Sequence, residues 1–227
     1  ATEDDHLALL ALLNSSTACF WLKQICFPKG GDTVGKEGAR VRKLQWDVYY
    51  AFDSTKLKQF PIPEEKPLAI TRLIQAEADA RSALLPEKLC AQGIPTRAQL
   101  DDASQRAAEH LARMIALQEE LDWLCYELYG ILEKAPMAPE AIPIQLGHRA
   151  FEIALARSGQ ETTWFSRHGS TPVTEFPQHW PQEYREVVQQ RLDLIAHNPE
   201  IALLEKCEHK RRWLRDSWEE QVQSALK

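Results

Sequence analysis

The sequence is poor in glycine, with nine glycines and 13 prolines among 227 residues. This disfavours long β-meanders and glycine-rich phosphate-binding loops, and neither a G-x-G-x-x-G nor a Walker motif occurs. Long hydrophobic runs are also missing. The longest, Leu7 to Leu13, falls short of the ~18 apolar residues that a membrane helix needs, and acidic residues precede it where a signal peptide would be basic. We therefore expect no membrane partner.

Cysteines are few and widely spaced. The five cysteines are an odd number and include no C-x-x-C pair. This pattern fits neither a disulfide framework nor a zinc site. Reduced thiols that are mostly buried as small apolar groups are the better interpretation, and we expect a cytoplasmic protein.

Positive charge is in deficit, because 27 lysines and arginines face 33 aspartates and glutamates and give a net charge of −6. This excludes a uniformly basic nucleic-acid-binding surface. Residues 20–60 are an exception, with eight cations and four acids, and the loop over 26–43 is rich in glycine and basic residues. Such a loop can approach a phosphate backbone closely and place arginine side chains on base edges. A solvated surface loop is the alternative.

The sequence after residue 64 is mostly helical in pattern. Apolar residues recur at steps of three and four from Leu100 to Ile131, which predicts a long helix over 99–133, and residues 68–84 between two prolines predict its antiparallel partner. His110 falls within this repeat and is expected to be a hydrogen-bonded core histidine. We expect a mainly α fold: a long antiparallel helical hairpin plus C-terminal helices, with a small β element near residues 41–52.

Prolines indicate boundaries between three parts. The segment Phe60–Pro63 must be extended, because each proline fixes its own φ and restricts the residue before it. Three further prolines lie within 135–146. We therefore divide the chain into residues 1–63, 64–134 and 135–227. In the first part, a helix over 4–25 is interrupted by Asn14–Thr17, whose small polar side chains serve either close helix packing or a polar interface.

The residues that could carry chemistry do not form a convincing catalytic or metal-binding set. His148 and Glu152 lie four residues apart on a predicted helix, and a metal-assisted hydrolase would need His168 and His179 to converge on them. Near the C-terminus, the run Lys206–Trp213 mixes basic residues with tryptophan. It could contact nucleic acid, but a solvated face with its aromatic residues turned inward is the more common arrangement.

Several motifs, taken in their order along the chain, resemble a known family. They are Leu12–Gln24 with Lys29-Gly30, Tyr50–Phe52 with Thr55–Leu57 and Phe60–Pro63, Gln118–Trp123 with Tyr126, Tyr129 and Gly130, Arg149–Glu152, Thr163–Phe165 with Arg167–Gly169, Trp180-Pro181 with Tyr184, and Glu208–Trp213 with Trp218–Glu220. Together they resemble the C-terminal region of the PglX family, the adenine-specific DNA methyltransferases of BREX-type phage defence. That family is related to the restriction–modification enzymes of types IIG and IIL.

The resemblance implies a DNA-recognition and scaffold function without the methyl-transfer site. The S-adenosylmethionine-binding fold and the Asn-Pro-Pro-Tyr motif of the family lie upstream of the matched region. No catalytic residue and no cofactor is therefore expected in this chain, although S-adenosylmethionine is implied for the full-length protein. Residues 1–63 would be the C-terminal part of a target-recognition domain that contacts double-stranded DNA, 64–134 a helical spacer, and 135–227 a C-terminal helical extension.

The predicted DNA contacts combine the basic loop with the polar interruption of the first helix. They are Lys23, Lys29, Lys36, Arg40, Arg42, Lys43, Ser15 and Ser16. The competing hypothesis is a protein-interaction module that docks other phage-defence proteins or a phage inhibitor. Exposure of Trp164, Trp180 or Trp213 in an apolar patch would favour this second hypothesis.

Overall fold

The computed structural model describes residues 2–29, 49–213 and 216–227. Its helices are α1 (Glu3–Leu13), α2 (Ser16–Ile25), α3 (Ser54–Leu57), α4 (Leu68–Ala83), α5 (Pro86–Cys90), α6 (Arg97–Leu128), α7 (Ala150–Arg157), α8 (Trp164–Arg167), α9 (Gln182–His197), α10 (Pro199–Leu204), the 3-10 helix η2 (Cys207–His209) and α11 (Trp218–Ala225). The mainly helical fold class predicted from the sequence is confirmed.

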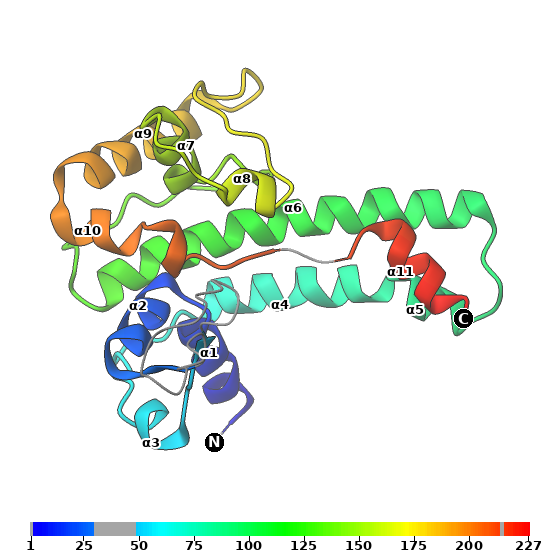
Figure 1. Cartoon of the computed structure of the whole chain (residues 1–227), viewed down its shortest axis with the longest axis horizontal. Helices are drawn as coiled ribbons and strands as arrows, with labels where there is room; N and C mark the ends of the chain where they lie inside the picture. Colours follow the sequence, from blue (N-terminus) through cyan, green and yellow to red (C-terminus); the bar gives the residue numbers. More distant parts are fainter. Residues whose placement is uncertain (1, 30–48, 214–215) are drawn as a thin grey trace, which may run out of the picture.

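Helix α6 organises the molecule, because it runs through most of its length with α4 beside it (Figure 1). Helices α1 to α3 lie on one side of its C-terminal half, and α7 to α10 lie on the other side. The last helix, α11, lies at the opposite end of the molecule and packs against α5. Both ends of the sequence therefore contact the hairpin.

The predicted helical hairpin is present as α4 and α6. Thr96 begins α6 as a capping box, in which its hydroxyl accepts a hydrogen bond from the Gln99 N–H and the Gln99 side chain accepts one from the Thr96 N–H. Small buried residues on the inner face of α6 let α4 approach closely. His110 joins the two helices, since its Nδ1 lies 2.6 Å from Oε2 of Glu77 on α4.

Helix α6 ends at Leu128 rather than at the predicted residue 133. Gly130 adopts a φ of 67°, the left-handed conformation that glycine tolerates without steric cost and that commonly ends helices. The N–H of Ile131 then donates to the carbonyl of Tyr126. The apolar periodicity continues past this point, so a local backbone signal outweighed the pattern from which the longer helix was predicted.

The C-terminal half of α6 is buried on all sides. Leu121 and Cys125 pack with α1 and α2, Ile115 packs with α7 and α9, and Trp123 packs with α10. Four polar or charged residues of the intervening stretch Gln118–Asp122 are also buried. The helix therefore places charged groups in the interior, where each one needs a partner.

The small β element is much reduced within the described residues. Tyr49–Tyr50 (β2) pairs antiparallel with Pro28–Lys29 (β1), in the register that places Pro28 opposite Tyr50. Residues 41–48 of the predicted element lie outside the described residues. A β element larger than this two-residue pairing is not supported.

The predicted C-terminal helices include α10, η2 and α11 as separate short helices. Residues 210–213 between η2 and α11 are not helical, and Ser217 caps α11 by accepting a hydrogen bond from the Glu220 N–H. In the part of the chain that the structure describes, no helix combines the length and the apolarity needed to cross a membrane.

Candidate nucleic-acid interface

The polar interruption between α1 and α2 serves the interior of the protein. Ser15 caps α2, since its hydroxyl accepts a hydrogen bond from the Ala18 N–H and donates one to the carbonyl of Leu12. The N–H of Ser16 donates to Oδ1 of Asp122 on α6 at 2.9 Å. Both serines are 1% exposed. Of the two interpretations of this polar segment, close helix packing therefore applies to Ser15 and Ser16. Buried side chains of this kind are not accessible to DNA, so we do not propose them as DNA contacts.

Lys23 lies in the last turn of α2 and is half-buried. Its ammonium group donates to the main-chain carbonyl of Glu208 and lies 5.6 Å from the centroid of the Tyr50 ring. Lys23 therefore joins α2 to the β1–β2 pairing and to η2. Lys29 belongs to β1 by its backbone. The side chain of Lys29 lies outside the described residues, as do four further predicted contacts: Lys36, Arg40, Arg42 and Lys43.

Cations from the C-terminal segment lie near Lys23. Lys206 and Arg212 are exposed on either side of η2. Burial raises the pKa of the Cys19 thiol, and the neighbouring charges of Lys23 and Arg212 oppose that rise. Burial likewise lowers the pKa of His209, and Lys23 and Lys206 lower it further. Lys23, Lys206 and Arg212 thus each lower the pKa of a side chain at the seam between α2 and η2.

A buried ion-pair network lies inside this seam, with Lys210 as its cation. The Lys210 ammonium donates to Oδ2 of Asp122 and to the hydroxyl of Tyr126, both at 3.2 Å, and also to Glu205. Burial lowers the pKa of Lys210, but the two carboxylates raise it well above its ordinary value, so the ammonium group stays charged. Burial raises the pKa of Glu205 to about 6, although Lys210 opposes this rise.

A second buried network joins the start of α7 to α8. Arg149 and Glu152 form a two-pronged ion pair, with Nε–Oε2 at 3.0 Å and Nη2–Oε1 at 2.9 Å. The indole N–H of Trp164 donates to Oε1 of Glu152 at 3.0 Å, and the N–H of Gly147 donates to Oε2 at 2.7 Å. Burial would raise the pKa of Glu152, but Arg149 and these donors lower it below its ordinary value. Both carboxylate oxygens are thus engaged by the protein itself.

A third buried network connects α6 with α9 and with the proline-rich segment 135–146. Arg191 is fully buried, and its Nη2 donates to Glu120 Oε2 at 2.7 Å and to the carbonyl of Pro136 at 2.8 Å. Glu119 accepts a hydrogen bond from the N–H of Ala150 at the start of α7, at 3.0 Å. Burial lowers the pKa of Arg191, but Glu120 and Glu119 raise it above its ordinary value.

The charged groups of these three networks are closed to solvent, and each network pairs one cation with one or two carboxylates, which indicates a structural role. Four of the motifs that carry the family resemblance contribute to them. The motifs are Gln118–Trp123, Arg149–Glu152, Thr163–Phe165 and Glu208–Trp213. Most of the motifs that carry the resemblance in the second half of the chain therefore contain residues that stabilise the interior.

Three of the four residues of the hydrolase hypothesis have other side chains as partners. Glu152 is held by Arg149, and His168 stacks on Trp164 with ring centroids 3.9 Å apart. His148 packs edge-on against another tryptophan, and burial lowers its pKa. Among the residues that the structure describes, no group of three or more potential ligands could hold a metal ion.

The tryptophans do not form the exposed patch that a docking module would need. Trp164 and Trp180 are buried, and Trp213 is half-buried against the core around Ile115. Arg211 covers Trp213, with its guanidinium carbon 4.4 Å from the ring centroid. Their burial counts against the tryptophan-based docking hypothesis.

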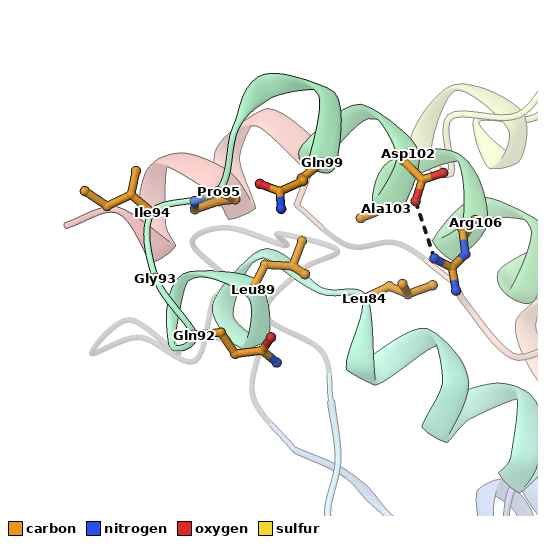
Figure 2. A pocket seen from close by; sticks show the side chains of 10 residues that line it. All are labelled: Leu84, Leu89, Gln92, Gly93, Ile94, Pro95, Gln99, Asp102, Ala103 and Arg106. Carbon is orange, nitrogen blue, oxygen red and sulfur yellow. Dashed lines mark hydrogen bonds and ion pairs between the residues drawn. The ribbon is translucent and has the colours of Figure 1, made fainter.

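A pocket lies at the tip of the hairpin, and few reactive side chains line it (Figure 2). Its walls come from the end of α4, from α5 and from the start of α6. The charged residues among those that line it are Asp102 and Arg106, which pair with each other at 3.4 Å (Figure 2). The lining includes no histidine, cysteine or serine, so this pocket is not a candidate active site.

Residues 114–227 match the family described as Domain of unknown function (DUF7008). The chain belongs to this family. The DUF7008 region begins within α6 and contains every charged residue of the three buried networks. These networks therefore lie within the DUF7008 region, where they connect the C-terminal half of α6 to the segments that follow it.

The chain is also similar to a named protein over its whole length. It is 45% identical, over an alignment of 237 residues, to the "Adenine-specific methyltransferase PglX" of Streptomyces coelicolor. This alignment covers 100% of the chain and 20% of the relative, so the chain spans about a fifth of the length of that curated relative. The predicted resemblance to the PglX family is confirmed. No solved structure matches the chain.

Our sequence reasoning missed the buried charges of the DUF7008 region. The pattern of the basic run Lys206–Trp213 predicts a solvated position for Lys210, and no sequence motif indicates that Arg191 is buried. A signal existed in the motifs themselves, where Glu119, Glu120 and Asp122 stand beside the large residues Leu121 and Trp123. Because apolar residues also flank these acids on both sides, at 114–117 and 124–125, the acids indicate buried partners.

Proposed function

We propose that this chain provides DNA contacts and a rigid scaffold for an adenine-specific DNA methyltransferase of a phage-defence system, and that it has no methyl-transfer site of its own. The observation that carries the proposal is the 45% identity, over the whole chain, to a protein named as an adenine-specific methyltransferase. Because the chain corresponds to 20% of that relative, most of the relative has no counterpart here.

The charge distribution supports DNA contact near the N-terminal part. Residues 20–60 contain eight cations and four acids, a net charge of +4, although the whole chain carries −6. Three cations of the second half are neutralised inside the protein and cannot meet phosphates. They are Arg149, Arg191 and Lys210. The cations proposed for DNA are those of the predicted interface, Lys23, Lys29, Lys36, Arg40, Arg42 and Lys43, together with the exposed Lys206 and Arg212 of the C-terminal segment.

S-adenosylmethionine is proposed to bind the part of the methyltransferase that this chain does not contain. The sequence has one Asn-Pro pair, Asn198-Pro199. Its Asn198 caps α10, with Oδ1 accepting hydrogen bonds from the N–H groups of Glu200 at 2.9 Å and Ile201 at 3.1 Å. An amide engaged in this way is not available to a target base, so we assign no methyl-transfer step to this chain.

In this proposal the three parts of the chain have different functions. Residues 1–63 complete a target-recognition domain on double-stranded DNA, residues 64–134 are a spacer, and residues 135–227 are an extension. The extension is attached to the spacer by the buried networks of α6. A helical hairpin that is packed along its length is stiff and can hold a recognition surface at a fixed distance. The protein would act in the cytoplasm, where it meets phage DNA.

DNA binding at two salt concentrations tests this proposal. We expect the chain to bind a labelled duplex of roughly 30 base pairs, with an affinity that falls steeply between about 50 and about 200 mM NaCl because phosphate contacts release counterions. The variant Arg40→Ala/Arg42→Ala/Lys43→Ala should bind about tenfold more weakly or worse. Its log–log salt slope should flatten by about 0.9 for each phosphate contact that is lost. Fluorescence anisotropy measures both quantities.

A matched control removes the same charge from the hairpin tip. Lys88, Arg97 and Arg106 are exposed there. Their triple alanine variant should keep most of the affinity and the wild-type salt slope. The proposal fails if the wild-type chain shows no salt-dependent DNA binding. The assignment of the loop fails if both triple variants lose affinity to the same extent.

A further inference from the structure

Two aromatic rings stack beside the β1–β2 pairing, and the outer ring is exposed to solvent. The rings of Tyr50 and Phe52 are nearly parallel, at 10°, with centroids 6.1 Å apart. Phe52 is 56% exposed. The Lys23 ammonium lies 5.6 Å from the Tyr50 centroid. The ring of Phe52 thus presents an open apolar surface next to a stacked ring and a cation.

A second exposed aromatic residue lies on the neighbouring strand. Phe27 precedes β1 and is 74% exposed, and its carbonyl accepts a hydrogen bond from the Ala51 N–H at 3.2 Å. This bond holds Phe27 opposite the residue that lies between Tyr50 and Phe52. The Lys56 ammonium lies 5.8 Å from the Phe27 ring centroid. Each of the two exposed phenylalanines is therefore near an aromatic–lysine contact.

The chemistry of this surface favours a nucleobase over an apolar protein side chain. Proteins that bind unpaired nucleic acid combine exposed rings, on which bases stack, with cations that follow the phosphates. Lys23 and Lys56 supply such cations, and they belong to the region of the chain that is rich in positive charge. An apolar protein partner would gain nothing from these lysines and would have to desolvate them.

We propose that Phe27 and Phe52, with Lys23 and Lys56, form a stacking site for unpaired nucleobases of DNA. The phenylalanine rings stack on base faces, and the two ammonium groups contact the adjoining phosphates. This inference rests on the proposed function, because it assumes that DNA meets this part of the chain. It goes further by assigning a preference for locally unpaired DNA to two aromatic residues, Phe27 and Phe52, that are not among the predicted DNA contacts.

Three labelled DNA probes test the stacking site: a single strand, the perfect duplex, and the same duplex with an unpaired bulge. We expect the wild-type chain to bind the bulged duplex more tightly than the perfect one in fluorescence anisotropy. Phe27→Ala/Phe52→Ala should weaken binding to the single strand and the bulge by about tenfold, and binding to the perfect duplex by much less. Phe27→Tyr/Phe52→Tyr should restore binding, because the rings are kept.

The control variant Leu73→Ala/Ile94→Ala removes two exposed apolar side chains from the hairpin and should bind all three probes as the wild type does. Equal binding of the bulge by the alanine variant and the wild type overturns the stacking site, and so does an equal loss on all three probes. If the wild-type chain binds duplex DNA with a steep salt slope but does not prefer the bulge, the stacking site is wrong and the proposed function stands. If the wild-type chain binds none of the three probes, both the stacking site and the proposed function are wrong. If the alanine variant changes only the oligomeric state in light scattering, the surface joins copies of the chain and the stacking proposal is wrong.

Discussion

Lys210 illustrates how much a single buried charge can hold together. It follows η2, and its ammonium group reaches Asp122 and Tyr126 on α6 as well as Glu205 at the end of α10. Asp122 in turn accepts the N–H of Ser16 at the start of α2. One lysine therefore ties the C-terminal segment to α6 and, through one carboxylate, to the N-terminal helices. Removing it would leave two carboxylates without their cation in the interior.

We predict that Lys210→Met lowers the free energy of unfolding by about 3–5 kcal/mol at pH 8, the usual cost of leaving a buried charge unpaired. The loss should be smaller at pH 5. Burial already raises the pKa of Glu205 to about 6, and without Lys210 it rises further. A carboxyl group whose folded-state pKa is raised contributes stability at low pH and loses it as the pH rises through that pKa. Urea unfolding at both pH values measures the difference.

Lys206→Met is the matched control for this prediction. Lys206 is exposed and stands four residues earlier in the same basic run. Its replacement should change the free energy of unfolding by less than about 0.5 kcal/mol at either pH. An equal loss in the two variants, or a loss at Lys210 that does not depend on pH, would show that the lysine is not the partner of the buried acids.

At the scale of elements, the turn before α7 depends on a glycine for two reasons. Gly147 has a φ of +98°, and a Cβ placed on it would lie 2.3 Å from the carbonyl oxygen of Thr171. Its N–H also donates to Glu152 at 2.7 Å, so the turn supports the Arg149–Glu152 network. Gly159, after the same helix, has a φ of +66° but nothing within 4 Å of the corresponding position.

We predict that Gly147→Ala destabilises the protein more than Gly159→Ala does. Both substitutions place an alanine in the left-handed region, which costs about 1 kcal/mol. The clash with Thr171 adds about 1–3 kcal/mol at Gly147 alone, because the obstacle is a main-chain oxygen. Thermal unfolding of the two variants gives the comparison. Equal melting temperatures would mean that the segment around Thr171 moves aside freely.

At the scale of the whole molecule, the C-terminal half of α6 is the common core. One cluster joins it to α1 and α2, a second to α7 and α9, and a third to α10. The hairpin tip, by contrast, packs against α5 and α11 and is more exposed. We therefore expect the elements around the C-terminal half of α6 to unfold together, and the tip to open independently at lower cost.

Hydrogen exchange measured by mass spectrometry tests this expectation. Amides of α2 and α10 should exchange with similar, high free energies of opening, while residues 91–96 at the tip should exchange earlier. Lys210→Met should lower protection in α2 and in α10 together, because both depend on the network around Asp122. Loss of protection in α10 with α2 unchanged would mean that the two ends of the chain are not coupled through α6.

Much of the fold could be predicted from local sequence signals, whereas the candidate site could be predicted only in part. The two prolines on either side of residues 68–84 and the apolar repeat of α6 located the hairpin. The break between α1 and α2 was visible at Asn14–Thr17, but the burial of Ser15 and Ser16 was not. Lys23 stays a predicted DNA contact, and its contacts with Tyr50 and Glu208 depend on segments far along the chain.

The sequence by itself determined where most of the helices lie, because caps, prolines and apolar periodicity act over a few residues. Periodicity alone did not fix the end of α6, which stops at Leu128 rather than at residue 133. It also determined that positive charge gathers within residues 20–60 of an otherwise acidic chain. Only the tertiary structure decided which charges face solvent. Lys206 and Lys210 belong to the same basic run, yet one is exposed and the other is buried. The difference arises because Asp122, 88 residues away, is brought to Lys210 by packing that no local pattern encodes.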